Sequence, residues 1–71
     1  METTARLKLG KKLKELRLKK GITQEELAGK AGIDYKYLQK IEGKTPPAIR
    51  IDTIEKLAKT LKITCSDLVD F

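Results

Sequence analysis

The sequence predicts an all-α fold, a compact bundle of short helices in a single domain spanning residues 1–71. Leucine, isoleucine and alanine supply most of the apolar side chains, aromatic residues make up only 4% of the chain, and tryptophan is absent. This composition suits packed helices better than a β-sandwich or barrel. A chain of 71 residues buries only about 60% of the surface that it exposes when unfolded, so every helix must contribute to one small core.

The side-chain chemistry excludes most catalytic sites. Cys65 is the single cysteine and the chain has no histidine, so neither a Cys/His metal cluster nor a Cys–His nucleophile pair can form. We therefore expect no enzyme, no metal, no cofactor and no small-molecule ligand. No apolar run approaches the roughly 18 residues of a membrane span, and the first residues lack the apolar core of a secretion signal. These features favour a cytoplasmic protein.

The net charge of +6 is unevenly distributed along the chain. Residues 1–20 carry eight basic and two acidic side chains, whereas residues 21–71 carry eight of each. Such a basic block attracts polyanions such as nucleic acid or anionic lipid, or it forms a solvated helix face that keeps the protein soluble. Charge alone leaves both interpretations open.

The first helix is predicted over residues 5–20, with Gly21 as its stop. Its apolar side chains recur on one stripe of the helical wheel. The members of this stripe are Ala5, Leu9, Leu13 and Leu16. Leu7 and Leu18 lie on the opposite side of the wheel, where they form either an interaction patch or, more commonly for isolated leucines, ordinary exposed surface.

The second helix is predicted to begin at Gln24. Thr23 and Glu26 have the T-x-x-E spacing of a capping box, which satisfies two free backbone amides at a helix start. Gly32 ends the helix because glycine adopts the left-handed conformation without a Cβ penalty. Gly29 costs about 1 kcal/mol relative to alanine in mid-helix, with no evident reason. The buried side of this helix carries Leu27, Ala28 and Ala31.

The third helix is predicted from the N-cap Asp34 to about Glu42, with Gly43 as its stop. Apolar residues recur within it at three-to-four spacing, namely Tyr37, Leu38 and Ile41. The segment GKTPPAIR that follows, residues 43–50, is a basic loop because its two adjacent prolines forbid regular helix.

The fourth helix is predicted to begin between residues 50 and 53. Asp52 with Glu55 forms one possible capping box, whereas Ile49 with Ile54 forms a hydrophobic staple around an earlier start. Its inward stripe consists of Ile54, Leu57, Ala58 and Leu61. A last short helix is capped by Thr64 with Asp67 and ends at Phe71.

Residues 23–42 thus form two helices of about eight residues joined by a short turn that contains glycine, which is the arrangement of a helix-turn-helix. The segment LRLKKGITQEELAGKAGIDYKYLQKIEGK resembles the core signature of the XRE-type helix-turn-helix family, that of the lambdoid phage repressors and Cro. TIEKLAKTLKIT is similar to the helix that follows this core. The resemblance implies five helices, with the third as the recognition helix in the DNA major groove.

The resemblance also implies functional residues. A structural pair is implied between Arg17 and Glu42, locking the recognition helix onto the first helix. Double-stranded DNA is the expected partner, with base contacts from Tyr35, Lys36, Gln39 and Lys40, which share the outer face of the third helix with Asp34. Phosphate contacts are expected from Gln24, Lys44, Thr45 and Arg50. The loop after Glu42 is about one residue longer than the usual family version. The resemblance therefore implies the phosphate contacts of this loop less directly than the base contacts of the recognition helix.

One such domain covers a single DNA half-site, so a homodimer on a palindromic operator is expected. Apolar residues at the end of the chain are candidates for its seam, or alternatively close the core of a monomer. They are Leu61, Ile63, Leu68, Val69 and Phe71.

The expected function is sequence-specific transcriptional regulation, most simply as a repressor. The alternative is an antitoxin or adaptor that uses the same fold to bind a protein, which the polar outer face of the third helix disfavours. A basic membrane-surface helix at residues 5–20 is a weaker alternative, because that segment lacks interfacial aromatic residues. The sequence does not distinguish a phage protein, a restriction-modification controller or a chromosomal regulator.

Overall fold

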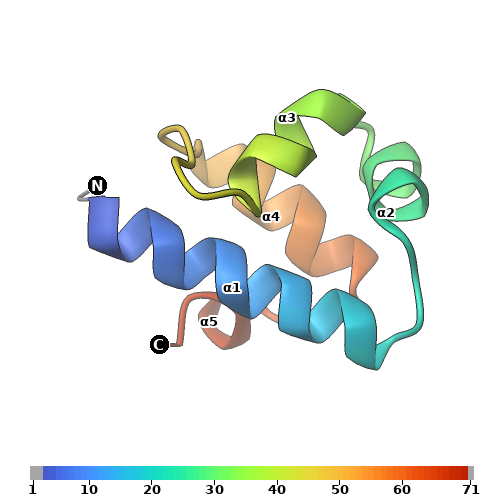
Figure 1. The fold of residues 1–71 in the computed structure, drawn as a ribbon. Coiled ribbons are helices and arrows are strands. Elements are labelled where there is room, and N and C mark those ends of the chain that lie inside the picture. The colour runs from blue at the N-terminus through green and yellow to red at the C-terminus, as the bar shows by residue number, and fades with distance from the viewer. Residues whose placement is uncertain (1–2, 71) are drawn as a thin grey trace.

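The computed structural model describes residues 3–70, and this range contains five helices and no strand. The helices are α1 (Thr3–Lys19), α2 (Gln24–Ala31), α3 (Tyr35–Ile41), α4 (Ile51–Thr60) and α5 (Cys65–Leu68). In Figure 1, α1 crosses the front of the molecule, α2 and α3 lie above it, α4 lies behind and α5 lies below. The predicted all-α fold with five helices is confirmed.

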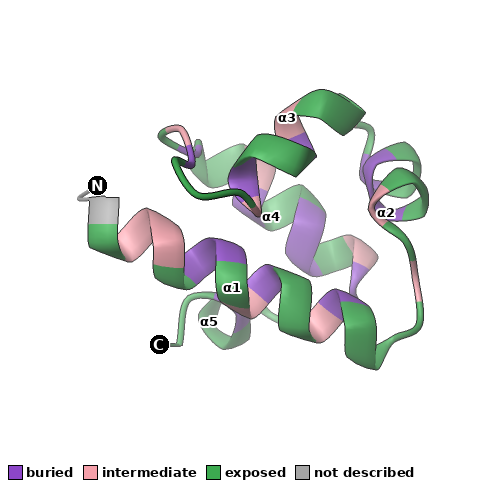
Figure 2. Cartoon of the chain, in the orientation of Figure 1, coloured by how far each residue is buried: buried purple, intermediate pink, exposed green. Residues whose placement is uncertain are grey.

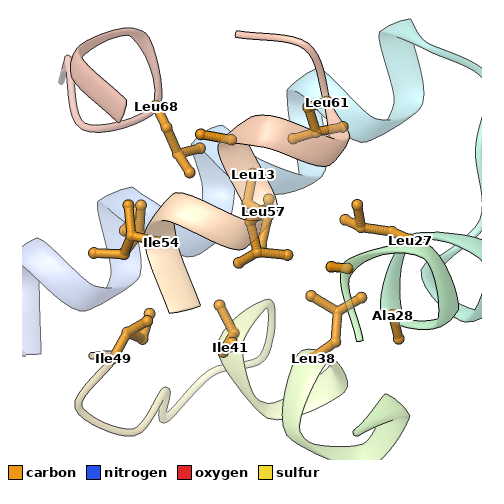
Figure 3. Packing of buried hydrophobic residues seen from close by; sticks show 13 residues of the cluster. Leu13, Leu27, Ala28, Leu38, Ile41, Ile49, Ile54, Leu57, Leu61 and Leu68 are labelled. Atoms are coloured by element: carbon orange, nitrogen blue, oxygen red, sulfur yellow. The ribbon is translucent and has the colours of Figure 1, made fainter. Parts of the chain in front are cut away.

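One hydrophobic core joins all five helices. Figure 3 shows its side chains converging between them. The core consists of Leu9, Leu13, Leu27, Ala28, Ala31, Leu38, Ile41, Ile49, Ile54, Leu57, Ala58, Leu61 and Leu68. Burying a leucine fully contributes about 1.5–3 kcal/mol before entropy is counted, so the eight largest fully buried side chains are a major part of the hydrophobic stabilisation. Of the stripe predicted for the first helix, Ala5 and Leu16 are only half-buried.

Two residues assigned to a dimer seam belong to this core instead. Leu61 and Leu68 are 0% exposed, so neither side chain can contact a second copy while the fold stays intact. Ile63 is half-buried against the same core, and Val69 is 42% exposed. Phe71 lies outside the described residues. Of the predicted seam residues that the structure describes, Ile63 and Val69 therefore remain available to a seam.

Three helices end in the same hydrogen-bonded motif, in which a left-handed residue lets two amides reach back to the last helical turn. After α2, Gly32 has φ +70° and the Ile33 amide donates to the Ala28 carbonyl at 3.0 Å. Gly21, with φ +66°, does the same after α1. After α4 the left-handed residue is Lys62, with φ +59°. The predicted stops at both glycines are confirmed, whereas the lysine was not anticipated.

The start of α4 is set by apolar packing rather than by a capping box. Arg50 occupies the N-cap position and makes no side-chain cap hydrogen bond. Ile49 and Ile54, which flank the first turn, are both buried, so the hydrophobic staple is the alternative that the structure adopts. Asp52 lies inside the helix and accepts a hydrogen bond from the Thr53 amide at 2.9 Å. The alternative capping box of Asp52 with Glu55 is wrong.

The crossing of α1 over α3 depends on a glycine. Gly10 is buried in α1, and a Cβ atom at this position would collide with the carbonyl oxygen of Ile41 at the end of α3. The backbones of the two helices therefore touch, which only glycine permits. Gly29 in α2 is different, since it is exposed and a Cβ there would meet nothing within 4 Å; nothing in the structure explains it.

Candidate nucleic-acid interface

The first helix of the helix-turn-helix is fixed at its start by a capping box. The Glu26 amide donates to the Thr23 hydroxyl at 3.0 Å, and the Thr23 amide donates to Glu26 Oε1 at 3.0 Å. This second hydrogen bond, from the Thr23 backbone, is the main reason that the pKa of the Glu26 carboxyl lies below its ordinary value of 4.5. The predicted start of α2 is thereby confirmed.

The turn between α2 and α3 leads directly into the residue that caps the start of α3. Gly32 reverses the backbone, Ile33 is half-buried against the core, and the Tyr37 amide donates to Asp34 Oδ2 at 3.1 Å. Because its carboxylate is held by this hydrogen bond, Asp34 serves as the N-cap of α3. Although Asp34 faces outward with the polar residues of α3, its role is therefore to cap the helix.

The outer face of α3 is polar and exposed. Figure 2 shows this face in green, with buried positions only on the side toward the core. Leu38 and Ile41 point inward and are 0% exposed. Tyr37 is half-buried, and its hydroxyl donates to the Ala48 carbonyl at 3.3 Å, which ties α3 to the following loop. The exposed residues are the four predicted base contacts, Tyr35, Lys36, Gln39 and Lys40.

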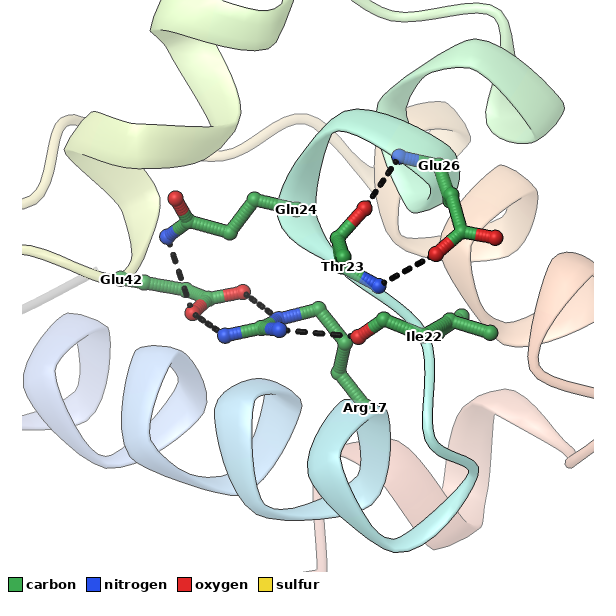
Figure 4. A network of polar contacts seen from close by, with 6 residues as sticks. All are labelled: Arg17, Ile22, Thr23, Gln24, Glu26 and Glu42. Atoms are coloured by element: carbon green, nitrogen blue, oxygen red, sulfur yellow. Dashed lines mark hydrogen bonds and ion pairs between the residues drawn. The ribbon is translucent and has the colours of Figure 1, made fainter.

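A buried ion pair braces the end of α3 against α1. Arg17 Nε and an Arg17 terminal nitrogen donate to the two carboxylate oxygens of Glu42, each at 3.0 Å. The other terminal nitrogen donates to the Ile22 carbonyl at 2.9 Å. The two side chains are 9% and 2% exposed, so every charged group is paired as burial requires. Figure 4 shows this arrangement, which contains the predicted structural pair.

Gln24 extends the pair into a three-residue network. Its side-chain amide donates to Glu42 Oε1 at 3.2 Å (Figure 4), so the first residue of α2 is held beside the last turn of α3. A primary amide has two N–H donors, and the second remains for a ligand. Sequence patterns gave no sign of this contact, because a glutamine at a helix start has no preferred partner 18 residues away.

The remaining predicted phosphate contacts lie beyond α3. Lys44 and Thr45 follow it directly and are exposed, and Arg50 is exposed at the start of α4. Arg50 Nε lies 3.3 Å from Asp52 Oδ1, but the two side chains are 82% and 58% exposed, so this pair is weak and easily exchanged. The structure thus places the predicted contacts on three adjoining segments: the start of α2, the face of α3 and the loop after it.

The described chain shows neither a membrane-spanning helix nor a metal-binding cluster. No helix within residues 3–70 has the length and apolarity needed to cross a bilayer. In the same range, no three His, Cys, Asp or Glu side chains are placed to share a metal ion.

Two short helices at a fixed bend, the second with a polar outer face, define a helix-turn-helix domain. The family comparison agrees, because a family model described as helix-turn-helix matches residues 13–68. The chain belongs to the XRE-type helix-turn-helix family, whose members are DNA-binding transcriptional regulators rather than enzymes.

Relatives with this fold cover the chain almost completely. Control protein C.BamHI from Bacillus amyloliquefaciens is 36% identical over 72 residues, which is 100% of this chain and 88% of that protein. The regulator DdrOP3 from Deinococcus deserti is 38% identical over 90% of this chain, which spans only 49% of that longer protein. The crystal structure of the restriction-modification controller C.AhdI from Aeromonas hydrophila superposes with a TM-score of 0.84 at 36% identity, covering 89% of this chain and 94% of that one.

Proposed function

We propose that this protein is a sequence-specific transcriptional regulator that binds double-stranded DNA in the cytoplasm, most simply as a repressor that occludes a promoter. The observation that carries the proposal is the exposed polar face of α3, which is held rigidly by the buried pair of Arg17 and Glu42. A recognition helix must be braced in this way, because its side chains discriminate bases only if their positions are fixed.

Base readout would come from the exposed side chains of α3. Lysine donates hydrogen bonds to O6 and N7 of guanine, and a tyrosine ring can contact a thymine methyl group, each good contact discriminating by about 1–3 kcal/mol. We assign these contacts to Tyr35, Lys36, Gln39 and Lys40.

Register on the duplex would come from phosphate contacts. We assign these to Gln24, Lys44, Thr45 and Arg50. Gln24 stands beside the free amides of the α2 N-terminus, where the helix dipole also favours an anion. Such contacts orient the protein and carry no sequence information directly.

A homodimer on a palindromic operator completes the proposal, since one helix-turn-helix reads one half-site and two half-sites lie about 34 Å apart. Ile63 and Val69 are the predicted seam residues that remain accessible. The restriction-modification controller C.AhdI, 94% of which this chain covers, supports a role in restriction-modification control as the biological setting.

The test is selection of bound sequences from a random DNA pool, followed by the same selection with single variants. We expect a palindromic consensus whose preferred bases change in Lys36→Ala. In Gln24→Ala the same consensus should return at lower affinity. Lys59→Ala, on the exposed side of α4, is the matched control and should leave the consensus unchanged. A pool without enrichment would contradict the proposal and favour the protein-binding module.

A further inference from the structure

A basic concavity lies beside the helix-turn-helix and shares only Lys44 with the predicted contacts. It has a volume of about 290 Å³ and is formed by α1 and the end of α3 with its loop. Lys11 and Lys14 contribute from α1, and Lys44 contributes from the loop. Lys11 and Lys14 are three residues apart in a helix and therefore project from the same side. The half-buried Leu7, four residues before Lys11, lines it too.

The positive charge of this concavity is not neutralised within the described chain. Lys11, Lys14 and Lys44 are all exposed, and none forms an ion pair with another described residue. Glu42 is the acidic residue in the lining, but both of its carboxylate oxygens are occupied by Arg17. Three lysines therefore line a space that contains no free carboxylate from its own lining, which is an environment suited to an anion.

The concavity adjoins the proposed phosphate site at Gln24. Glu42 lies between the two, since it accepts a hydrogen bond from Gln24 and also lines the concavity. Lys44, a proposed phosphate contact, is shared as well. A duplex bound to α3 would place a regular row of phosphates next to this concavity, because each strand has one negative charge about every 3.4 Å along the helix axis.

We propose that Lys11, Lys14 and Lys44 form a second phosphate-binding site for the backbone of the same duplex, so that the DNA footprint extends from the helix-turn-helix onto α1. The proposal rests on the DNA binding proposed above. It also gives a function to part of the basic block in residues 1–20, which the helix-turn-helix alone does not use.

The test compares two double variants that remove the same charge. Lys11→Ala with Lys14→Ala removes two lysines of the concavity. Lys56→Ala with Lys59→Ala removes two exposed lysines that line a different basic concavity, between α2 and α4. Binding to the selected duplex is followed by fluorescence anisotropy between about 50 and 200 mM salt, the range over which phosphate contacts dominate the change in affinity. Circular dichroism verifies that both variants are folded.

Each phosphate contact contributes about 0.9 to the slope of log affinity against log salt concentration. We expect the Lys11/Lys14 variant to lose nearly 2 from this slope and to bind about 10-fold more weakly at the low-salt end. The Lys56/Lys59 variant should keep the wild-type slope. Changing Lys11 and Lys14 to arginine should preserve the slope, since the charge remains.

Equal slopes for the two alanine variants would overturn the phosphate site while leaving the proposed function intact. The separate failure of the proposed function would be visible in the wild-type protein, which would then select no sequence from the pool. Loss of preferred bases in the Lys11/Lys14 variant would also contradict the proposal, because phosphate contacts should weaken binding to all sequences alike.

Discussion

Replacing Gly10 by alanine tests whether the backbones of α1 and α3 touch. The substitution adds one methyl group in the middle of α1, where alanine is intrinsically favoured over glycine by about 1 kcal/mol. In this fold the new Cβ would collide with the carbonyl oxygen of Ile41. A main-chain oxygen cannot rotate away as a side chain can, so the helices must separate.

The change in the free energy of unfolding for Gly10→Ala follows from two opposing effects. Overpacking a well-packed core costs about 1–3 kcal/mol, and the collision with main chain places this case at the upper end, near 3 kcal/mol. The gain in helix propensity offsets about 1 kcal/mol. We therefore expect Gly10→Ala to lower the free energy of unfolding by about 2 kcal/mol, equivalent to a decrease in Tm of roughly 8–16 °C for a domain of this size.

Gly29→Ala is the matched control, because it makes the same chemical change in the middle of α2. A Cβ at Gly29 meets nothing within 4 Å, so only the propensity gain of about 1 kcal/mol applies. Its Tm should rise by about 4–8 °C. Both variants are measured by thermal melts and urea titrations followed by circular dichroism.

The opposite signs of the two effects make the test decisive. If Gly10→Ala proved as stable as Gly29→Ala, the close approach of α1 to α3 would be wrong. Gly10→Ala should also weaken DNA binding at temperatures where it remains folded, because the displaced end of α3 leads directly into Glu42 and Lys44. Unchanged binding would show that this end of α3 does not position the interface.

Three further predictions concern individual residues. Arg17→Met leaves the buried Glu42 carboxylate unpaired, so the free energy of unfolding in urea should fall by about 3–5 kcal/mol; a loss below about 1 kcal/mol would mean that the pair behaves as a surface pair. Lys62→Gly should raise Tm, since the left-handed conformation at φ +59° costs a non-glycine residue about 1–2 kcal/mol; an unchanged melt contradicts this strain. The pKa of Glu26 is lowered from 4.5 mainly by the hydrogen bond from the Thr23 amide, so its stabilisation is complete above pH 4.5 and disappears as pH falls through the lowered pKa; an NMR titration giving 4.5 or more for Glu26 would refute it.

The helices were predictable because their signals are local. The capping box of Thr23 with Glu26 and the stop at Gly32 involve residues within one or two turns, and the structure contains both. The start of α4 was left open because Asp52 and Ile49 offer competing local signals. Tertiary packing resolved the choice by burying Ile49 with Ile54, an effect that capping patterns do not contain.

Parts of the candidate site were also predictable, but only those that follow from the spacing of apolar residues along a helix. The inward positions of Leu38 and Ile41 leave the four polar residues of α3 on the outside, as expected. The hydrogen bond from Gln24 to Glu42 was not foreseen. The assignment of Leu61 and Leu68 to a seam failed because an apolar residue near the chain end has the same pattern whether it packs on its own core or on a partner.

The amino-acid sequence by itself determined which segments are helical, where the two helices of the helix-turn-helix begin and end, and which face of each helix is apolar, since these properties arise from interactions within a few residues. It did not determine the start of α4 or the end of α5, which was predicted at Phe71 and lies at Leu68. The tertiary structure alone decided that the backbones of α1 and α3 touch at Gly10, that Arg17 pairs with Glu42 while the lysines of the neighbouring concavity form no ion pair, and that Leu61 and Leu68 are buried in the core. Those outcomes depend on distances between segments far apart in the chain, and such distances are fixed only when the helices pack together.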